Sequence, residues 1–194
     1  HRAWAATHHA QHPAPAAFGN DRTPERRLRI GYVSPDFVTH SVASFIAPVL
    51  AAHDRDAVEI HCFADVPRPD AVTLALRNRS DRWHDVAPLD DDALAALVRR
   101  DAIDILVDLA GHTADNRLGV FARRAAPVQV TWLGYPGSTG LDAIDYRLCD
   151  AVTDPVGAAD DLSAERIVRL PRGFHCYQPP EDAPPPAPPP QSAS

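Results

Sequence analysis

Short apolar runs alternate with amphipathic segments along most of this 194-residue chain, and no other feature constrains its fold as much. Strands are predicted at residues 28–33, 57–64, 82–86, 103–109, 127–133, 145–148 and 167–170. Helices with a periodic apolar face are predicted between them, at residues 41–52, 70–79, 90–100 and 115–124. Strands that alternate with helices at this spacing predict an α/β fold with a doubly wound, mostly parallel sheet.

Composition narrows the class of function. The chain is 45% hydrophobic, which is enough to form the core of one domain. Its net charge is −7 and its basic residues form no cluster, so we expect no nucleic-acid partner. No apolar run approaches the roughly 20 residues that cross a bilayer, so we expect no membrane contact. Three cysteines without CxxC spacing are typical of a reducing compartment, which predicts a cytoplasmic location.

The two ends differ in composition from the middle of the chain. Residues 1–26 are rich in Ala, His and Pro and are predicted to be a linker, with residues 2–7 as the fraying end of a preceding helix. Residues 179–194 are dominated by proline, cannot pack a core, and are predicted to be an extended linker toward a further domain. The folded domain is therefore expected to span residues 27–178.

Two predicted strands run into glycine loops. Gly111-His112-Thr113 follows the strand at 103–109, and Leu133-Gly134-Tyr135-Pro136-Gly137 follows the strand at 127–133. Because the carboxyl ends of parallel strands meet where ligands bind, we expect both loops to form one wall of a cleft. Glycine lets a ligand approach the backbone, and Tyr135 offers an aromatic face to a hydroxylated ligand. The alternative is a plain tight turn with Tyr135 in the core.

His40 is a third candidate, because it follows the opening strand and directly precedes the helix at 41–52. A helix N-terminus favours a neutral imidazole, which can accept or donate one hydrogen bond. The alternative for His40 is a helix cap. For Asn116 and Arg117, at the start of the next helix, ligand binding and simple capping or ion pairing remain equally open.

Other polar residues are assigned no chemistry. Four aspartates could suggest a metal, but we expect no metal site: Asp104, Asp108, Asp142 and Asp145. Asp108 is expected only to cap or orient His112, and Trp132 is expected in the core. The remaining histidines share no spacing and are interpreted as linker or structural residues: His8, His9, His12, His53, His61, His84 and His175.

Three long motifs carry a resemblance to a known family. They are RIGYVSPDFVTHSV at residues 29–42, DLAGHTADNRLGVFARRAAPVQVTWLGYPG at residues 108–137, and ERIVRLPRGFHCYQPP at residues 165–180. Together they resemble the N-terminal catalytic lobe of the O-GlcNAc transferase family. The resemblance implies a GT-B glycosyltransferase built from two Rossmann-like lobes. Such an enzyme transfers N-acetylglucosamine from UDP-GlcNAc to Ser or Thr of a protein acceptor, with inversion and without a cofactor.

The resemblance also implies roles for particular residues. It makes His40 catalytic and gives substrate-binding roles to His112, Thr113, Leu133, Gly134, Tyr135 and Pro136. It places tetratricopeptide repeats before residue 1 and, after the proline-rich linker, a C-terminal lobe whose lysine binds the phosphates of UDP. This chain itself has no lysine.

One departure from the family pattern and two alternative functions remain. Ser44 stands where relatives carry a second histidine. The alternative functions are a non-catalytic module that binds nucleotide sugars and a protein-interaction module that uses the polyproline segment.

Overall fold

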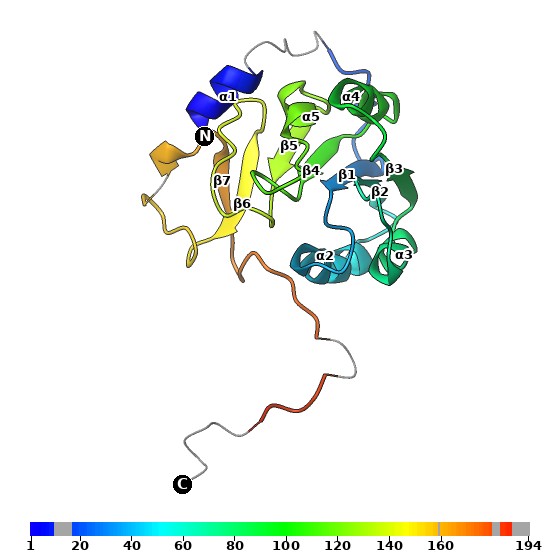
Figure 1. The fold of residues 1–194 in the computed structure, drawn as a ribbon. Helices are drawn as coiled ribbons and strands as arrows, with labels where there is room; N and C mark the ends of the chain where they lie inside the picture. The colour runs from blue at the N-terminus through cyan, green and yellow to red at the C-terminus, as the bar shows by residue number, and fades with distance from the viewer. Residues whose placement is uncertain (10–16, 159, 180–182, 188–194) are drawn as a thin grey trace.

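The structure is a computed structural model that describes residues 1–9, 17–158, 160–179 and 183–187 (Figure 1). Its strands are β1 (Leu28–Ser34), β2 (Val58–Ala64), β3 (Arg82–Asp85), β4 (Ile105–Asp108), β5 (Val128–Thr131), β6 (Tyr146–Asp150) and β7 (Arg166–Leu170). Its helices are α1 (Arg2–His9), α2 (Ser41–Ala52), α3 (Ala71–Arg77), α4 (Asp91–Arg100), α5 (Leu118–Ala122) and the short 3-10 helix η1 (Asp160–Leu162). Among the described residues, no helix is long and apolar enough to span a membrane.

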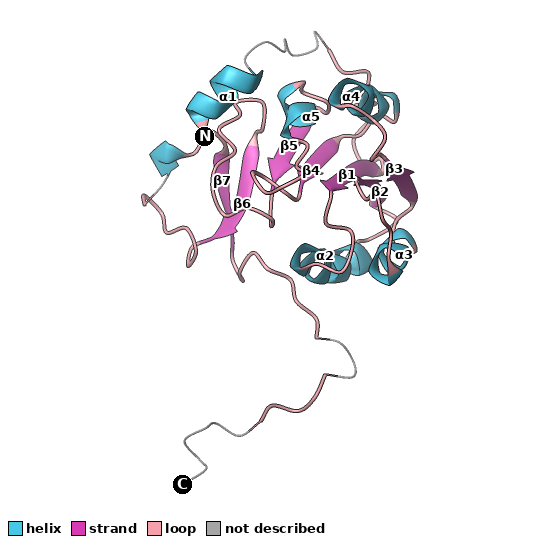
Figure 2. Ribbon diagram, in the orientation of Figure 1, coloured by secondary structure: helices cyan, strands magenta, loops and turns pink. Residues whose placement is uncertain are grey.

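All seven strands form one sheet in the order β3-β2-β1-β4-β5-β6-β7, and every neighbouring pair is parallel (Figure 2). The chain winds outward from β1 to β3, then crosses back to β4 and continues outward to β7. This is the doubly wound arrangement of a Rossmann-like lobe, so the predicted fold class is confirmed.

Two separate hydrophobic clusters cover the two faces of the sheet. Successive residues of a strand point to opposite faces, so Tyr32 packs in the cluster under α2 and α3 while Val33 packs in the cluster under α4 and α5. In β4, Leu106 and Val107 divide in the same way. Figure 1 shows these two helix layers on opposite sides of the sheet. The central strands β1, β2, β4 and β5 are largely buried on both faces, which explains their continuous apolar runs.

The predicted elements lie within a few residues of those observed, with one clear difference. The helix expected at 115–124 is reduced to α5, at Leu118–Ala122. Asp115 and Arg124 both have positive φ angles, of 56° and 51°, which an α-helix cannot contain. Asn116 Oδ1 accepts a hydrogen bond from the amide of Leu118 at 3.2 Å, so it caps the shorter helix.

The N-terminal residues pack more closely on the lobe than a linker would. Ala5 of α1 is 7% exposed and belongs to the core cluster under α4 and α5. Asn20 and Arg26 both donate hydrogen bonds to the carboxylate of Asp104, at 2.6–2.7 Å. These described residues therefore pack against the lobe, and the linker assigned to residues 1–26 stays a prediction. The domain boundaries near 27 and 178 stay predictions, and His12 lies outside the described residues.

The chain that leaves β7 turns back across the carboxyl edge of the sheet. The indole of Trp132 donates to the carbonyl of Phe174 at 3.0 Å, and the amide of Phe174 donates to Asp150 at 3.0 Å. His175 then stacks on Phe45 of α2, with ring centroids 4.4 Å apart. This segment connects the carboxyl ends of β5 and β6 to helix α2, and Trp132 is buried as expected.

Candidate active site at the carboxyl edge of the sheet

The sheet reverses its winding between β1 and β4, and the loops that follow these two strands carry His40 and His112. Parallel strands all end at one edge, so both loops lie there, next to the loop of Gly134 after the adjacent β5. At such a reversal the two connections leave toward opposite faces and open a crevice between them. The shared edge expected for His40, His112 and Pro136 is confirmed.

His40 caps helix α2. Its backbone is extended and its Nδ1 accepts a hydrogen bond from the amide of Val42 at 3.3 Å. The same Nδ1 lies 3.6 Å from Oδ1 of Asp36, four residues earlier. The imidazole is 45% exposed, so it is also open to solvent. The capping alternative is therefore observed, but a cap that uses only Nδ1 leaves Nε2 for a ligand.

Asp36 gives the imidazole a charged neighbour. Burial raises the pKa of Asp36, an effect that His40 opposes and Asp115 reinforces. Asp115 follows the His112 loop, so the loops after β1 and β4 influence one another electrostatically. Sequence reasoning missed Asp36, although its spacing of four residues before His40 was visible.

Asp70, the N-cap residue of α3, fixes the loop that carries His40. Asp70 Oδ2 accepts hydrogen bonds from the amide and hydroxyl of Thr39 at 2.7 and 2.6 Å. Its other oxygen accepts from the amide of Thr73 at 2.9 Å and so caps α3. Hydrogen bonds from Thr39 and Thr73 hold the pKa of Asp70 well below its ordinary value. One carboxylate thus fixes the residue next to His40.

Asp108 organises the His112 loop, as expected. Its carboxylate accepts hydrogen bonds from the amides of Ala110 and Gly111 at 2.9–3.1 Å, and from the hydroxyl of Thr131 at 2.7 Å. Burial raises the pKa of Asp108 despite these bonds. Asp108 therefore joins the loop after β4 to strand β5 and is engaged in that role.

The two glycine loops cross each other. A Cβ on Gly111, whose φ is +58°, would lie 2.4 Å from Cβ of Tyr135. A Cβ on Gly134 would lie 2.1 Å from the carbonyl oxygen of Leu109. Both glycines are thus explained by contact between the loops, not by the ligand approach that the sequence suggested. The crossing fixes the backbones of the two loops against one another.

Leu133 is held in an uncommon backbone conformation. Its φ is +80°, and the amide of Gly134 donates to the carbonyl of Trp132 across it at 3.1 Å. A hydrogen bond between residues two apart, with positive φ between them, defines the rare form of γ-turn. Such strain costs roughly 1–3 kcal/mol and is common at binding sites.

The imidazole of His112 is fixed by a hydrogen bond and by two aromatic neighbours. Its Nε2 donates to the carbonyl of Thr139 at 2.8 Å, so a neutral ring carries its lone pair on Nδ1. The rings of Trp4 and Tyr135 meet it edge-on at 4.6 and 5.5 Å. Thr139 also connects His112 to a buried acid, Glu165. Burial alone would raise the pKa of Glu165, but hydrogen bonds from Thr139 and Ser138 lower it below its ordinary value.

The remaining predicted residues occupy the same edge with local partners. The Thr113 hydroxyl donates to the carbonyl of Ala110 at 2.9 Å, and the exposed Pro136 offers its carbonyl to Arg147 at 3.2 Å. Arg117 is mostly buried and pairs with Asp91 at 3.2 Å. For Asn116 and Arg117, the capping and ion-pairing alternatives are therefore the observed ones.

This arrangement defines a class of protein: a Rossmann-like lobe with histidine and glycine loops at its switch point. The chain belongs to glycosyl transferase family 41, whose model matches residues 6–178. The probable UDP-N-acetylglucosamine–peptide N-acetylglucosaminyltransferase SPINDLY of Solanum lycopersicum is 43% identical over 189 residues, covering 95% of this chain and 20% of that protein. The UDP-N-acetylglucosamine–peptide N-acetylglucosaminyltransferase of Caenorhabditis elegans is 37% identical over 151 residues, covering 77% of this chain and 13% of that protein.

A solved structure supports the same family assignment. A mutant of the Thermobaculum terrenum O-GlcNAc transferase superposes with a TM-score of 0.90 and 50% identity, covering 96% of this chain and 36% of that chain. The fold is accordingly that of a GT-B lobe. The chain spans about a fifth of the length of the curated plant relatives named SPINDLY.

Proposed function

We propose that this chain is the acceptor-side catalytic lobe of an inverting glycosyltransferase that moves N-acetylglucosamine from UDP-GlcNAc to Ser or Thr of proteins. The observation that carries the proposal is the position of His40 and His112 on the two loops that flank the sheet's switch point. The names of the relatives, which act on peptides with UDP-N-acetylglucosamine, support the substrate class.

In the proposed reaction the acceptor hydroxyl attacks the anomeric carbon as the bond to the diphosphate breaks. UDP leaves with the electron pair, and the configuration at the carbon inverts. Positioning of the two reactants and stabilisation of the leaving diphosphate would supply most of the acceleration.

His40 would handle the acceptor side. While Nδ1 accepts from Val42, a neutral ring carries its proton on Nε2 and can only donate there. A proton on Nδ1, directed at Asp36 3.6 Å away, would free the lone pair of Nε2 for the acceptor hydroxyl. We infer that Asp36 is a positioning residue that supports this second tautomer.

The other predicted residues would form the wall beside the donor sugar. The loops of His112 and Gly134 lock one another, so His112, Thr113, Leu133, Gly134, Tyr135 and Pro136 would present a fixed surface that loses little entropy on binding. We further propose that a second, lysine-bearing lobe elsewhere in the polypeptide holds the UDP, that tetratricopeptide repeats present the acceptor, and that the enzyme works in the cytoplasm without a cofactor.

A transfer assay with the full-length protein tests this proposal. The protein is incubated with Ser/Thr peptides and each of several nucleotide sugars, and the products are analysed by mass spectrometry. We expect N-acetylglucosamine on a hydroxyl residue and stoichiometric release of UDP. Binding of UDP-GlcNAc without turnover would instead support a non-catalytic module, and turnover of another sugar alone would contradict the donor.

A further inference from the structure

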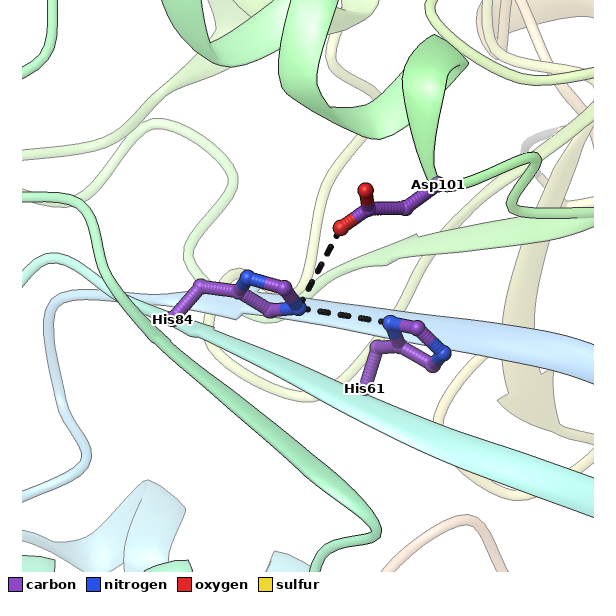
Figure 3. A group of neighbouring side chains, drawn as sticks. All are labelled: His61, His84 and Asp101. Atoms are coloured by element: carbon purple, nitrogen blue, oxygen red, sulfur yellow. Dashed lines mark hydrogen bonds and ion pairs between the residues drawn. The ribbon is translucent and has the colours of Figure 1, made fainter.

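His61 and His84 meet on the α4 face of the sheet, although nothing in the sequence connected them. His61 lies in β2 and His84 in β3, and the parallel register places Phe63 opposite His84. The two imidazoles stack nearly parallel, with an interplanar angle of 13°. Asp101, the residue that ends α4, reaches the same point (Figure 3).

Three donor atoms converge there. Nδ1 of His61 lies 3.3 Å from Nε2 of His84, and Nε2 of His84 lies 3.5 Å from Oδ2 of Asp101. All three ligand atoms lie within 4.8 Å of one another. We propose that these three atoms bind a divalent transition-metal ion of the zinc type.

The two distances from Nε2 of His84 suit that ion. Zinc binds nitrogen and carboxylate oxygen at about 2.0–2.2 Å in tetrahedral sites, so two ligand atoms of one site lie roughly 3.3–3.5 Å apart. Two imidazoles and one carboxylate form a set of three protein ligands that leaves a fourth position open. Both distances are longer than an ordinary hydrogen bond of about 2.9 Å, so hydrogen bonding alone accounts for them poorly.

The partner of His61 orients its lone pair toward the site. Nε2 of His61 lies 3.2 Å from Oε1 of Glu59, an acceptor that places the ring proton on Nε2. The lone pair is then on Nδ1, which faces His84. A carboxylate behind a metal-binding histidine is the usual outer partner of such ligands.

Without a metal, only one proton, at long hydrogen-bond distances, links the three ligand atoms. The proton on Nε2 of His84 faces two acceptors, His61 Nδ1 and Asp101 Oδ2. A metal ion at this point would satisfy all three lone pairs once the ring proton of His84 has moved from Nε2 to Nδ1. The neutral ring keeps its proton, so binding would release none.

Arginines line the cavity beside the cluster. The cluster lines a cavity of about 350 Å³ together with Arg29, Arg82 and Arg100. Arg100 pairs with Oδ1 of Asp101 at 3.0 Å, which leaves Oδ2 to face His84. Their positive charge favours an anion, such as chloride, as the fourth ligand. The cavity is lined by early residues of β1, β2 and β3, so it lies away from the carboxyl edge that carries His40.

Titration calorimetry with zinc chloride tests the site, and cobalt absorption reports its geometry. His8, His9 and His12 are first replaced by alanine in all samples, because they offer competing ligands. We expect one zinc ion per chain with micromolar affinity or tighter, and the intense visible bands of tetrahedral cobalt.

Two variants and one control complete the experiment. Asp101→Asn keeps the side-chain volume but removes the charged ligand, and should weaken binding at least about tenfold. Glu59→Gln should weaken it by roughly 10–100-fold through the orientation of His61. Asp56→Asn, on an exposed turn, should change nothing. Millimolar or weaker zinc affinity in the parent, or unchanged affinity in folded Asp101→Asn and Glu59→Gln, overturns the proposal.

Discussion

The hydroxyl of Thr39 donates a hydrogen bond of 2.6 Å to Asp70, the residue that caps helix α3. The carboxylate thus serves two elements at once, because it also closes the capping box of α3 with Thr73. Through this contact, the position of α3 fixes the loop that presents His40.

Replacing Asp70 should separate this contact from ordinary capping. Asp70→Ala should lower the melting temperature and also reduce turnover of the full-length protein, because the His40 loop loses its anchor. Asp90→Ala is the matched control, since Asp90 caps α4 through the amide of Ala93 at 2.8 Å. Asp70→Ala should lose more thermal stability than Asp90→Ala because it also loses the bonds to Thr39, and equal turnover in both would show that Asp70 has only a structural role.

The crossing of the glycine loops predicts a steric penalty. Gly134→Ala places a methyl group 2.1 Å from the carbonyl oxygen of Leu109, so the loops must separate. We expect a loss of at least about 2 kcal/mol in the free energy of unfolding, measured by urea denaturation. Gly19→Ala is the control, since no atom of the described structure lies within 4 Å of its new Cβ. Equal stability of the two variants would refute the crossing.

The environment of Asp104 leads us to expect a particular dependence of stability on pH. Burial alone would raise its pKa, but hydrogen bonds from Arg26, the amide of Arg29 and Asn20 lower it below its ordinary value. An acid with a lowered folded-state pKa stabilises the fold above its unfolded pKa, and this contribution is lost as the pH falls through the folded value.

Asp104→Asn should therefore destabilise the protein at pH 7 and flatten the fall in stability below about pH 4. Denaturation curves between pH 3 and pH 7 measure this, with Asp142→Asn as the exposed control. A variant whose acid-induced loss of stability equals that of wild type would contradict the assignment.

The sequence predicted the fold and the edge that carries the site. The order of strands and helices placed His40, His112 and Gly134 after three strands, and the parallel topology then requires that they share an edge. The purpose of the glycines was not predictable, because Gly111 and Tyr135 meet only when two loops cross. The same holds for Asp70, whose contact with Thr39 spans 31 residues.

The pair of His61 and His84 was likewise not predictable from the sequence. His61 and His84 are 23 residues apart, and only the register of β2 against β3 brings them together. Residue spacing along a chain reports neighbours within one helix or strand, not between strands. The packing of α1 was missed for a related reason, because one small buried residue, Ala5, gives no periodic signal.

The proposed second lobe predicts weak donor binding by this chain alone. In titration calorimetry with UDP, the 194-residue chain should bind with millimolar affinity or weaker, about 4 kcal/mol or less. It should also transfer no sugar. Micromolar binding would mean that the main contacts to UDP lie within this lobe.

The most direct test of the account concerns His40, which both caps α2 and is proposed to act on the acceptor hydroxyl. His40→Asn separates the two roles, because asparagine is among the best N-caps but has no imidazole. His40→Ala, which removes both, should cost about 1 kcal/mol of stability. The measurement is turnover and melting temperature of the His40→Asn full-length protein. We predict a melting temperature equal to wild type with turnover at least about 10²-fold lower; turnover within a few-fold of wild type would contradict the catalytic role.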